Sequence, residues 1–160
     1  MYEEKFGEWV AKIGNLHGSF VHLPIEKVPW ARLRRPLAES RLALVTTGGV
    51  HRRDQTPFDE LNEDGDWSFR EIPDNTPSDA LTISHVHYAH ADADRDINCV
   101  FPLDRLHELQ VQGEIGAVAP AHFGFMGYIP DPRELFATTA PAVARRLKEL
   151  EVDAVLMTSG

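Results

Sequence analysis

The chain has 160 residues, 42% of them hydrophobic and 26% charged, which is typical of a globular protein and excludes a mainly disordered one. Its formal net charge of −9 opposes binding to nucleic acids and to anionic membrane surfaces. No apolar run approaches the roughly 20 residues that span a bilayer, and the acidic N-terminus does not resemble a secretory signal, so we expect a cytoplasmic protein. The single cysteine, Cys99, excludes an internal disulfide.

Residues 1–40 are predicted to form a helix and an extended arm. Apolar side chains at Phe6, Val10 and Ile13 follow a helical spacing, which predicts an amphipathic helix over residues 2–14. Several prolines and arginines follow between residues 22 and 36, and this composition favours an irregular arm. Such an arm could contact another subunit, so we expect an oligomer, although a simple surface strap fits as well.

Residues 41–160 are predicted to form one α/β domain, because strand patterns alternate with helix patterns. The fold that we predict is an open, mostly parallel sheet with helices on both faces. It is expected to be incomplete at its C-terminal end, since no covering helix follows the last strand. The predicted strands are 41–46, 67–72, 80–84, 115–119 and 152–158, and the predicted helices begin at Pro102 and span 131–150, the second with a kink or break at Pro141.

Glycines and histidines gather in the segments that are predicted to follow the strands. In a parallel sheet such segments emerge at one edge and can line one pocket. Glycines there allow backbone N–H groups to approach an anionic substrate, and imidazoles can exchange protons near neutral pH. The alternative is that these glycines only make turns. The residues concerned are Gly48, Gly49, His51, Ser84, His85, His122, Gly124, Gly127 and 158–160.

A histidine-rich stretch offers a different chemistry. Three histidines and three aspartates supply enough nitrogen and oxygen donors for zinc or another transition metal, although local hydrogen bonding of loop histidines explains the pattern equally well. These residues are His85, His87, His90, Asp92, Asp94 and Asp96.

Cys99 and Arg70 have two interpretations each. Cys99 precedes a predicted helix whose dipole would lower the thiol pKa, but the apolar Val100 and Phe101 beside it favour a buried, inert cysteine. Arg70 lies next to Glu71 on a predicted strand, where it could form a surface ion pair or an anion clamp.

Five blocks of sequence, in order and with plausible spacing, resemble the glycine, sarcosine, betaine and D-proline reductase selenoprotein B family, with D-proline reductase as the most similar member. The resemblance covers residues 41–160. The blocks are LVTTGGVH (44–51), DWSFREIP (66–73), SH (84–85), DINCVFPLDRL (96–106) and VAPAHFGFMG (118–127).

The resemblance implies an oxidoreductase component that cleaves a C–N bond in a small amino acid or amine, with a disulfide as the acceptor. It implies a partner subunit with a pyruvoyl group and a thiol reductant protein. In the family, selenocysteine or cysteine directly follows the stretch that matches residues 152–160, so we expect a UGA codon after Gly160 and a chain truncated before its nucleophile. No cofactor and no metal are expected within the segment itself, and the substrate is left open.

Roles for individual residues follow from the same resemblance. Cys99 is the candidate resolving thiol, and three histidines are candidates for protonating the leaving amine or orienting a carboxylate. A metal-dependent hydrolase or lyase built on His85, His87, His90 and His122, or a non-catalytic fragment, are the alternatives. The expected catalytic residues are Cys99, His51, His85 and His122, and the expected substrate contacts are Gly48, Gly49, Arg70, Ser84, Gly124, Ser159 and Gly160.

Overall fold

The computed structural model describes residues 21, 23 and 30–160. The predicted helix over residues 2–14 lies outside the described residues. The predicted boundary near residue 40, between an arm and a domain, stays a prediction.

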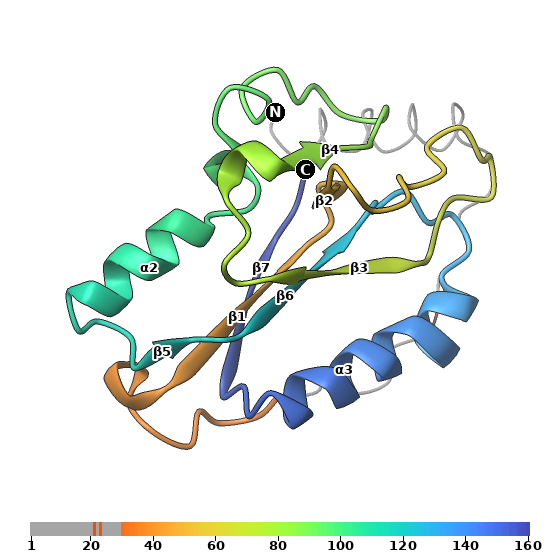
Figure 1. Ribbon diagram of the computed structural model, residues 1–160. Helices are drawn as coiled ribbons and strands as arrows, with labels where there is room; N and C mark the ends of the chain where they lie inside the picture. The colour runs from red at the N-terminus through yellow and green to blue at the C-terminus, as the bar shows by residue number, and fades with distance from the viewer. Residues whose placement is uncertain (1–20, 22, 24–29) are drawn as a thin grey trace, which may run out of the picture.

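The main sheet is built around β1 (Arg41–Thr46), which runs through its centre. On one side β1 pairs in parallel with β7 (Ala154–Thr158), and on the other with β5 (Ala117–Val118) and β6 (Ala121–Phe125). The edge strand β3 (Phe69–Pro73) is antiparallel to β6 (Figure 1). The predicted α/β fold with a mostly parallel sheet is therefore confirmed.

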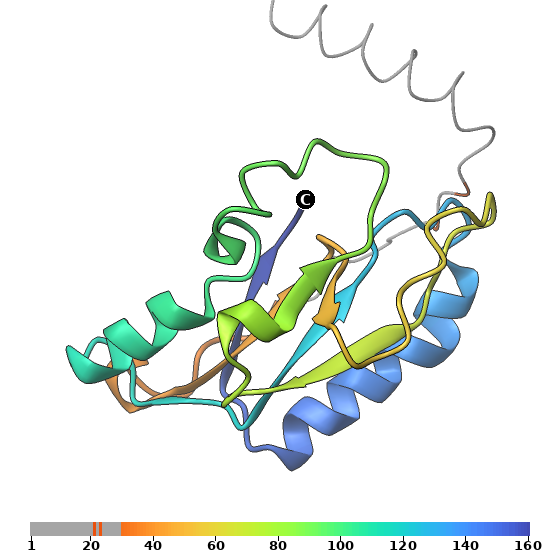
Figure 2. The ribbon, with the colours of Figure 1, turned by 45° about the horizontal axis from the view of Figure 1, so that its top comes forward.

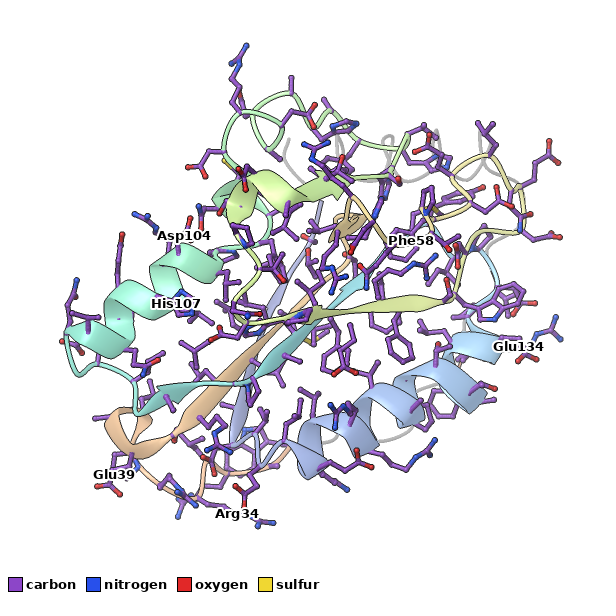
Figure 3. All side chains as sticks on the ribbon, in the orientation of Figure 1. Arg34, Glu39, Phe58, Asp104, His107 and Glu134 are labelled. Atoms are coloured by element: carbon purple, nitrogen blue, oxygen red, sulfur yellow. The ribbon has the colours of Figure 1, made fainter. Side chains whose placement is uncertain are left out.

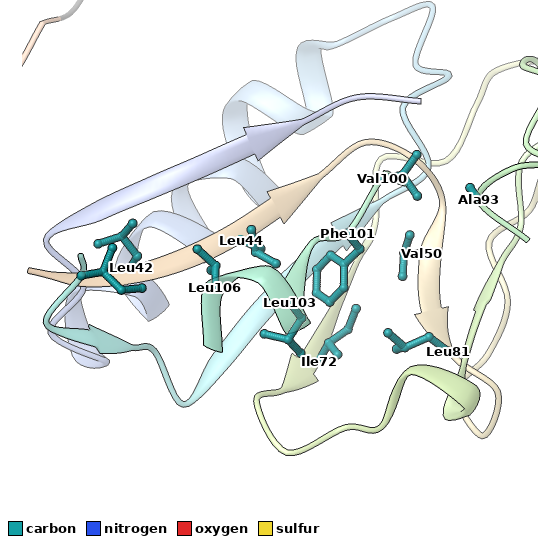
Figure 4. Packing of buried hydrophobic residues seen from close by; sticks show 11 residues of the cluster. Leu42, Leu44, Val50, Ile72, Leu81, Ala93, Val100, Phe101, Leu103 and Leu106 are labelled. Carbon is teal, nitrogen blue, oxygen red and sulfur yellow. The ribbon is translucent and has the colours of Figure 1, made fainter. Parts of the chain in front are cut away.

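Two helices cover opposite faces of this sheet, α2 (Leu103–Val111) and α3 (Ala140–Glu149). Successive side chains of a strand point to opposite faces, and β1 shows this directly. Leu44 belongs to the buried cluster that contains the leucines of α2, whereas Val45 packs in a second cluster with Val143 of α3. The larger cluster is shown in Figure 4. Helices on both faces are thus confirmed.

A second, two-stranded antiparallel sheet pairs β2 (Val50–Arg52) with β4 (Leu81–Ile83). The expectation that strand 80–84 joins the parallel sheet was therefore wrong. Gly49, with φ of 74°, turns the chain out of β1 and into β2. The loop that follows β4 therefore starts from this second sheet and not from a strand of the main parallel sheet.

The strand beside β1 is interrupted, and this overturns part of the sequence prediction. Residues 120–127 were expected to be a loop, yet β6 is a fully buried strand. Between the pairs Leu42–Val118 and Val45–Phe123, two residues of β1 face four residues of the neighbouring chain. Pro120 lies in this bulge, where its missing N–H costs no ladder bond. Because proline and glycine are typical of loops, the sequence did not reveal this core strand.

The helix before β7 is continuous rather than broken. A π-helical turn, η4 (Leu135–Thr139), leads into α3, and the N–H of Ala140 bonds to the carbonyl of Leu135. This wider turn accommodates Pro141, which cannot donate a backbone hydrogen bond. Among the described residues, no helix is long and apolar enough to cross a membrane, and the cytoplasmic location stays a prediction. Short 3-10 helices complete the fold: η1 (Leu37–Glu39), η2 (Ser78–Ala80) and η3 (Ile97–Cys99).

Candidate functional site

The carboxyl ends of β1 and β7 are joined to the segment that carries the only cysteine. The N–H of Thr47 donates to the carbonyl of Thr158 at 3.0 Å. The hydroxyls of Thr46 and Thr158 both donate to the carbonyl of Val100, at 2.9 and 2.6 Å. These bonds fix the residue after Cys99 at the end of two parallel strands, the usual position of ligand sites in open α/β sheets.

Gly160 and Gly48 meet at this edge, beneath Tyr88. The loop after β4 passes around the end of β7 (Figure 2), and the Tyr88 hydroxyl donates to the carbonyl of Gly48 at 2.9 Å. A Cβ atom added to Gly160 would lie 2.5 Å from Cε1 of Tyr88 and 3.0 Å from the Cα of Gly48. A side chain at Gly160 would require the Tyr88 ring to move.

Gly49 brings the start of the same loop to the site. Its carbonyl accepts the N–H of Ser84 at 2.9 Å. A Cβ at Gly49 would lie 2.4 Å from the Ser84 carbonyl oxygen and 2.9 Å from the Cβ of His85, and the positive φ independently favours glycine. The structure thus brings together several predicted site residues: Gly48, Gly49, Ser84, His85, Ser159 and Gly160. We call this group the strand-end site.

The backbone amides of the two glycines are already used by the fold. The Gly48 N–H donates to the Thr46 hydroxyl at 3.1 Å, and the Gly49 N–H donates to the Phe125 carbonyl at 2.8 Å. The expected contact of these amides with an anionic substrate is therefore not supported by their geometry. An anion at the strand-end site needs another donor.

His51 lies behind the strand-end site and is 3% exposed. Its Nδ1 is 2.8 Å from the carbonyl of Arg52, which can only accept, so Nδ1 carries the proton. Its Nε2 then accepts the hydroxyl of Ser84 at 2.9 Å. Burial lowers the pKa of His51, and the cation of Arg70 acts in the same direction. His51 is thus a neutral base that orients the Ser84 hydroxyl.

His85 follows Ser84 and is also buried. Its Nδ1 accepts the backbone N–H of His87 at 3.0 Å, and its ring meets the Tyr88 ring edge-on with centroids 4.7 Å apart. Burial, followed by the nearby His87 and His90 rings, lowers the pKa of His85 to about 4. The imidazole is therefore neutral at pH 7.

His122 was expected at the strand-end loops but lies inside β6, completely buried. Its Nδ1 accepts the N–H of Leu44 at 3.0 Å, within the bulge where β1 lacks a ladder partner. Its Nε2 lies 3.2 Å from Oδ1 of Asp74, an oxygen that His107 also contacts at 2.8 Å. His107 is carried by α2 (Figure 3). Burial lowers the pKa of His122 although Asp74 opposes this. The imidazole replaces a backbone carbonyl and stabilises the interrupted sheet.

Gly124 and Arg70 serve packing and loop closure. A Cβ at Gly124 would lie 2.0 Å from the Val50 carbonyl oxygen, so glycine permits β2 to approach β6. The Arg70 guanidinium donates to the carbonyls of Thr56 and Pro57 at 2.7 and 3.0 Å, and it lies 4.4 Å from the Phe58 ring centroid. These contacts hold the loop before β3. A role of Arg70 as a carboxylate clamp has no support in this geometry.

Cys99 is exposed, so the expectation that its apolar neighbours bury it was wrong. It ends the three-residue helix η3, and α2 begins only at Leu103, so the thiol is not at the α2 N-terminus. Its Sγ lies 4.0 Å from the carbonyl oxygen of Asp92. The thiol is accessible and is one residue from the carbonyl that fixes the strand ends.

The predicted metal cluster is not assembled. Within the part of the chain that the structure describes, no group of three or more His, Cys, Asp or Glu side chains could hold a metal ion. His90 pairs with Asp94 at 2.9 Å, His87 stacks on Tyr128 with centroids 3.8 Å apart, and His122 lies in the sheet. The hydrolase or lyase alternative therefore has no structural support.

An apolar groove of 530 Å³ lies between α3 and the β1–β7 side of the sheet. Val155 and Met157 of β7 line it and are 37% and 69% exposed. The groove offers packing surface and lacks the polar groups of the strand-end site. The strand-end site is therefore a better candidate for the catalytic site than this groove.

Sequence reasoning missed several residues that build the site. Tyr88 and the two threonines act through hydrogen bonds to carbonyls distant in the chain, and Asp74 and His107 meet only in three dimensions. Tyr88 lies within the histidine-rich stretch, yet only its histidine and aspartate neighbours were singled out. No spacing rule predicts which of its neighbours faces the glycines.

Comparison with known proteins gives a consistent family. The family model of glycine/sarcosine/betaine reductase selenoprotein B matches residues 17–160. The chain is 41% identical over 143 residues to the D-proline reductase subunit gamma of Acetoanaerobium sticklandii, covering 89% of this chain and 58% of that protein. It is 29% identical to the glycine reductase complex component B subunit gamma of Carboxydothermus hydrogenoformans, covering 84% of this chain and 31% of that protein.

A third relative is the betaine reductase complex component B subunit beta of Peptoclostridium acidaminophilum, which is 28% identical and is matched over 86% of this chain and 32% of its own length. No solved structure is significantly similar to the chain. The chain thus spans about three fifths of one curated relative and about a third of the others. It belongs to the glycine/sarcosine/betaine reductase selenoprotein B family.

Proposed function

We propose that this chain carries the strand-end part of a substrate-cleaving site in a multi-subunit reductase, which breaks a C–N bond in an amino acid or related amine. The observation that carries the proposal is the meeting of Gly48, Tyr88 and Gly160 at the carboxyl ends of β1 and β7, in a member of this reductase family. Relatives of this chain are named as subunits of D-proline, glycine and betaine reductases.

The nucleophile in this proposal is selenocysteine or cysteine directly after Gly160, and a pyruvoyl group of a partner subunit activates the substrate. A residue in that position would leave β7 beside Gly48 and Tyr88, because a Cβ atom added to Gly160 would lie within 3.0 Å of an atom of each. A chalcogen nucleophile needs an accessible position and a nearby proton-transfer or hydrogen-bonding group. The exposed end of β7 and the buried imidazole of His85 meet these needs.

Residues of this chain then divide the work. His51 orients the Ser84 hydroxyl, whose lone pairs are left to accept a hydrogen bond from a leaving amine or its ammonium form. Cys99 is the resolving thiol in the proposal, since it is exposed and its chain is tied to β1 and β7 through Val100. A separate thiol protein would supply the two reducing equivalents and be oxidised to a disulfide, while the substrate accepts the electrons as its C–N bond breaks.

Three measurements test this proposal. The gene is expected to encode selenocysteine or cysteine directly after Gly160, and any other residue there contradicts the assigned nucleophile. The protein in complex with its partner subunit and a dithiol is expected to release ammonia or an amine from glycine, sarcosine or betaine, or to open the ring of D-proline to 5-aminopentanoate. Cys99→Ser should slow turnover with the protein reductant, while substrate binding stays unchanged. Failure of the intact complex to consume any of the four would overturn the reductase assignment.

A further inference from the structure

His85 is held in one tautomer by the backbone. The N–H of His87 donates to Nδ1 of His85 at 3.0 Å. A backbone amide can only donate, so Nδ1 must carry a lone pair and the ring proton must sit on Nε2. A doubly protonated ring would set Nδ1–H against the N–H of His87. Geometry alone therefore fixes His85 as the neutral Nε2–H form.

The surroundings of His85 disfavour a positive charge as well. The groups that face it are the imidazole of His87, with ring centroids 5.7 Å apart, the phenol of Tyr88 and, further away, His90. His90 is itself paired with Asp94, so that carboxylate is already engaged. Burial is the main cause that lowers the pKa of His85 to about 4. At pH 6–8 the ring remains an uncharged donor.

The three histidines that are buried among residues 30–160 differ in what their second ring nitrogen does. In His51 both nitrogens are bonded, to Arg52 and Ser84. In His122 both are bonded, to Leu44 and Asp74. Nε2 of His85 makes no hydrogen bond to another described residue. His85 is thus the buried imidazole whose donor is left for a ligand or water.

The strand-end site needs such a donor. The amides of Gly48 and Gly49 are used by the fold, and the Ser84 hydroxyl proton goes to His51. Arg70 is held by the loop before β3. Nε2–H of His85 is the ring donor that remains: the Cβ of His85 packs closely on Gly49, and its ring meets the Tyr88 ring edge-on. Neutral imidazole is an effective hydrogen-bond donor when its environment prevents protonation.

We propose that His85 binds an acceptor oxygen of the substrate carboxylate through its neutral Nε2–H, and does not act as a proton-transferring acid. This rests on the proposed function for the identity of the substrate, and it restricts that substrate to an amino acid rather than a simple amine. Tyr88 is the positioning residue: its ring packs on His85 and its hydroxyl holds the Gly48 carbonyl.

The donor itself is tested on the chain labelled with ¹⁵N-histidine. Between pH 6 and 8, NMR should show His85 with a protonated Nε2 and an unprotonated Nδ1, with no titration step near pH 6.5. Addition of glycine or D-proline should shift the Nε2 resonance, whereas ethylamine, which lacks a carboxylate, should not. A protonated Nδ1, a titration near pH 6.5, or an equal response to ethylamine would overturn the proposal.

Two matched variants test the role in turnover by the complete complex. The amide nitrogen of His85→Gln lies near the position of Nε2, whereas that of His85→Asn lies near Nδ1. His85→Gln should keep kcat/KM within about 3-fold, and His85→Asn should raise KM by about 10–100-fold, the cost of a lost hydrogen bond to a charged group. Neither variant should change the pH profile between 6 and 8.

Two results would identify His85 as a proton donor and overturn the proposal. One is an equal loss of kcat/KM in both variants. The other is a change of wild-type activity near pH 6.5 that both variants abolish. Unfolding midpoints of both variants show whether a loss reflects folding. If the wild-type complex consumes no amino acid, the reductase assignment fails, and the response of the Nε2 resonance to glycine still decides whether His85 binds a carboxylate.

Discussion

Two buried histidines, His122 and His85, share the same hydrogen bond at Nδ1 but have different roles. Each accepts a backbone N–H at Nδ1, at 3.0 Å in both places, and each is therefore fixed as the neutral Nε2–H tautomer. In the sheet interior, Nε2 of His122 is bonded to Asp74. At the strand-end site, Nε2 of His85 has no bond to another described residue. The second ring nitrogen thus distinguishes a structural histidine from a candidate binding one.

The largest expected effect on stability tests the structural role of His122. His122→Ala should lower the free energy of unfolding by about 4 kcal/mol, because it leaves a cavity and an unpaired Leu44 N–H in the core. His85→Ala should cost only about 1–2 kcal/mol, since part of its ring faces a ligand position. Urea unfolding of both variants measures the difference. Equal costs would remove the distinction between the two sites.

The glycine loop of the strand-end site gives the next effect. Gly49→Ala should cost about 3 kcal/mol, because its Cβ would clash with the Ser84 carbonyl at 2.4 Å and φ is 74°. Gly113→Ala is the matched control: φ is 76° but nothing lies within 4 Å, so about 1 kcal/mol is expected. Thermal or urea unfolding of the two variants separates backbone strain, which both share, from the steric clash at Gly49. A Gly49→Ala cost no larger than the control would contradict the close packing of the loop.

Acid should lower the free energy of unfolding through histidines of both the strand-end site and the sheet interior. The pKa values of His51, His85 and His122 are lowered in the folded protein, so the unfolded chain takes up protons first as the pH falls below about 6.5. Stability is fully present above that pH and is lost toward about pH 4 for His85, by up to about 1.4 kcal/mol per pH unit for each histidine. His85→Gln should reduce this slope by one proton. An unchanged slope would contradict a neutral His85.

The smallest effect concerns Tyr88. Tyr88→Phe removes the hydrogen bond to the Gly48 carbonyl but keeps the ring against His85 and Gly160, so a loss of about 1 kcal/mol is expected. Hydrogen exchange of the Thr47 amide, which closes β1 against β7, should accelerate in this variant. Unchanged exchange there would show that Tyr88 does not hold the strand ends.

The sequence predicted the α/β architecture because its helices and most of its core strands carry clear periodic patterns. It failed at residues 120–127, where Pro120 and two glycines resemble a loop but form a bulge and a core strand. It also failed for strand 80–84, because periodicity does not reveal which sheet a short strand joins. Gly48 and Gly49 were expected to bring backbone N–H groups to a substrate, whereas the structure uses both amides in the fold.

Individual site residues were harder to predict than the site itself. The strand-end segments converge, yet His122, Gly124 and Arg70 turned out to be engaged in the fold. The reason is physical: a sequence shows which side chains can donate or accept, but the partners of a ring nitrogen can be distant in the chain, as Leu44 and Asp74 are for His122. Cys99 shows the same limit, since apolar neighbours did not bury it.

Mapping of amide chemical shifts during titration with D-proline and glycine tests the central claim most directly. The strand-end site predicts that the largest shifts fall on Gly48, Gly49, Ser84 and Gly160, with little change in α3 or around His122. Shifts concentrated along the apolar groove beside α3, or none at saturating amino acid, would contradict the assignment of substrate binding to the ends of β1 and β7.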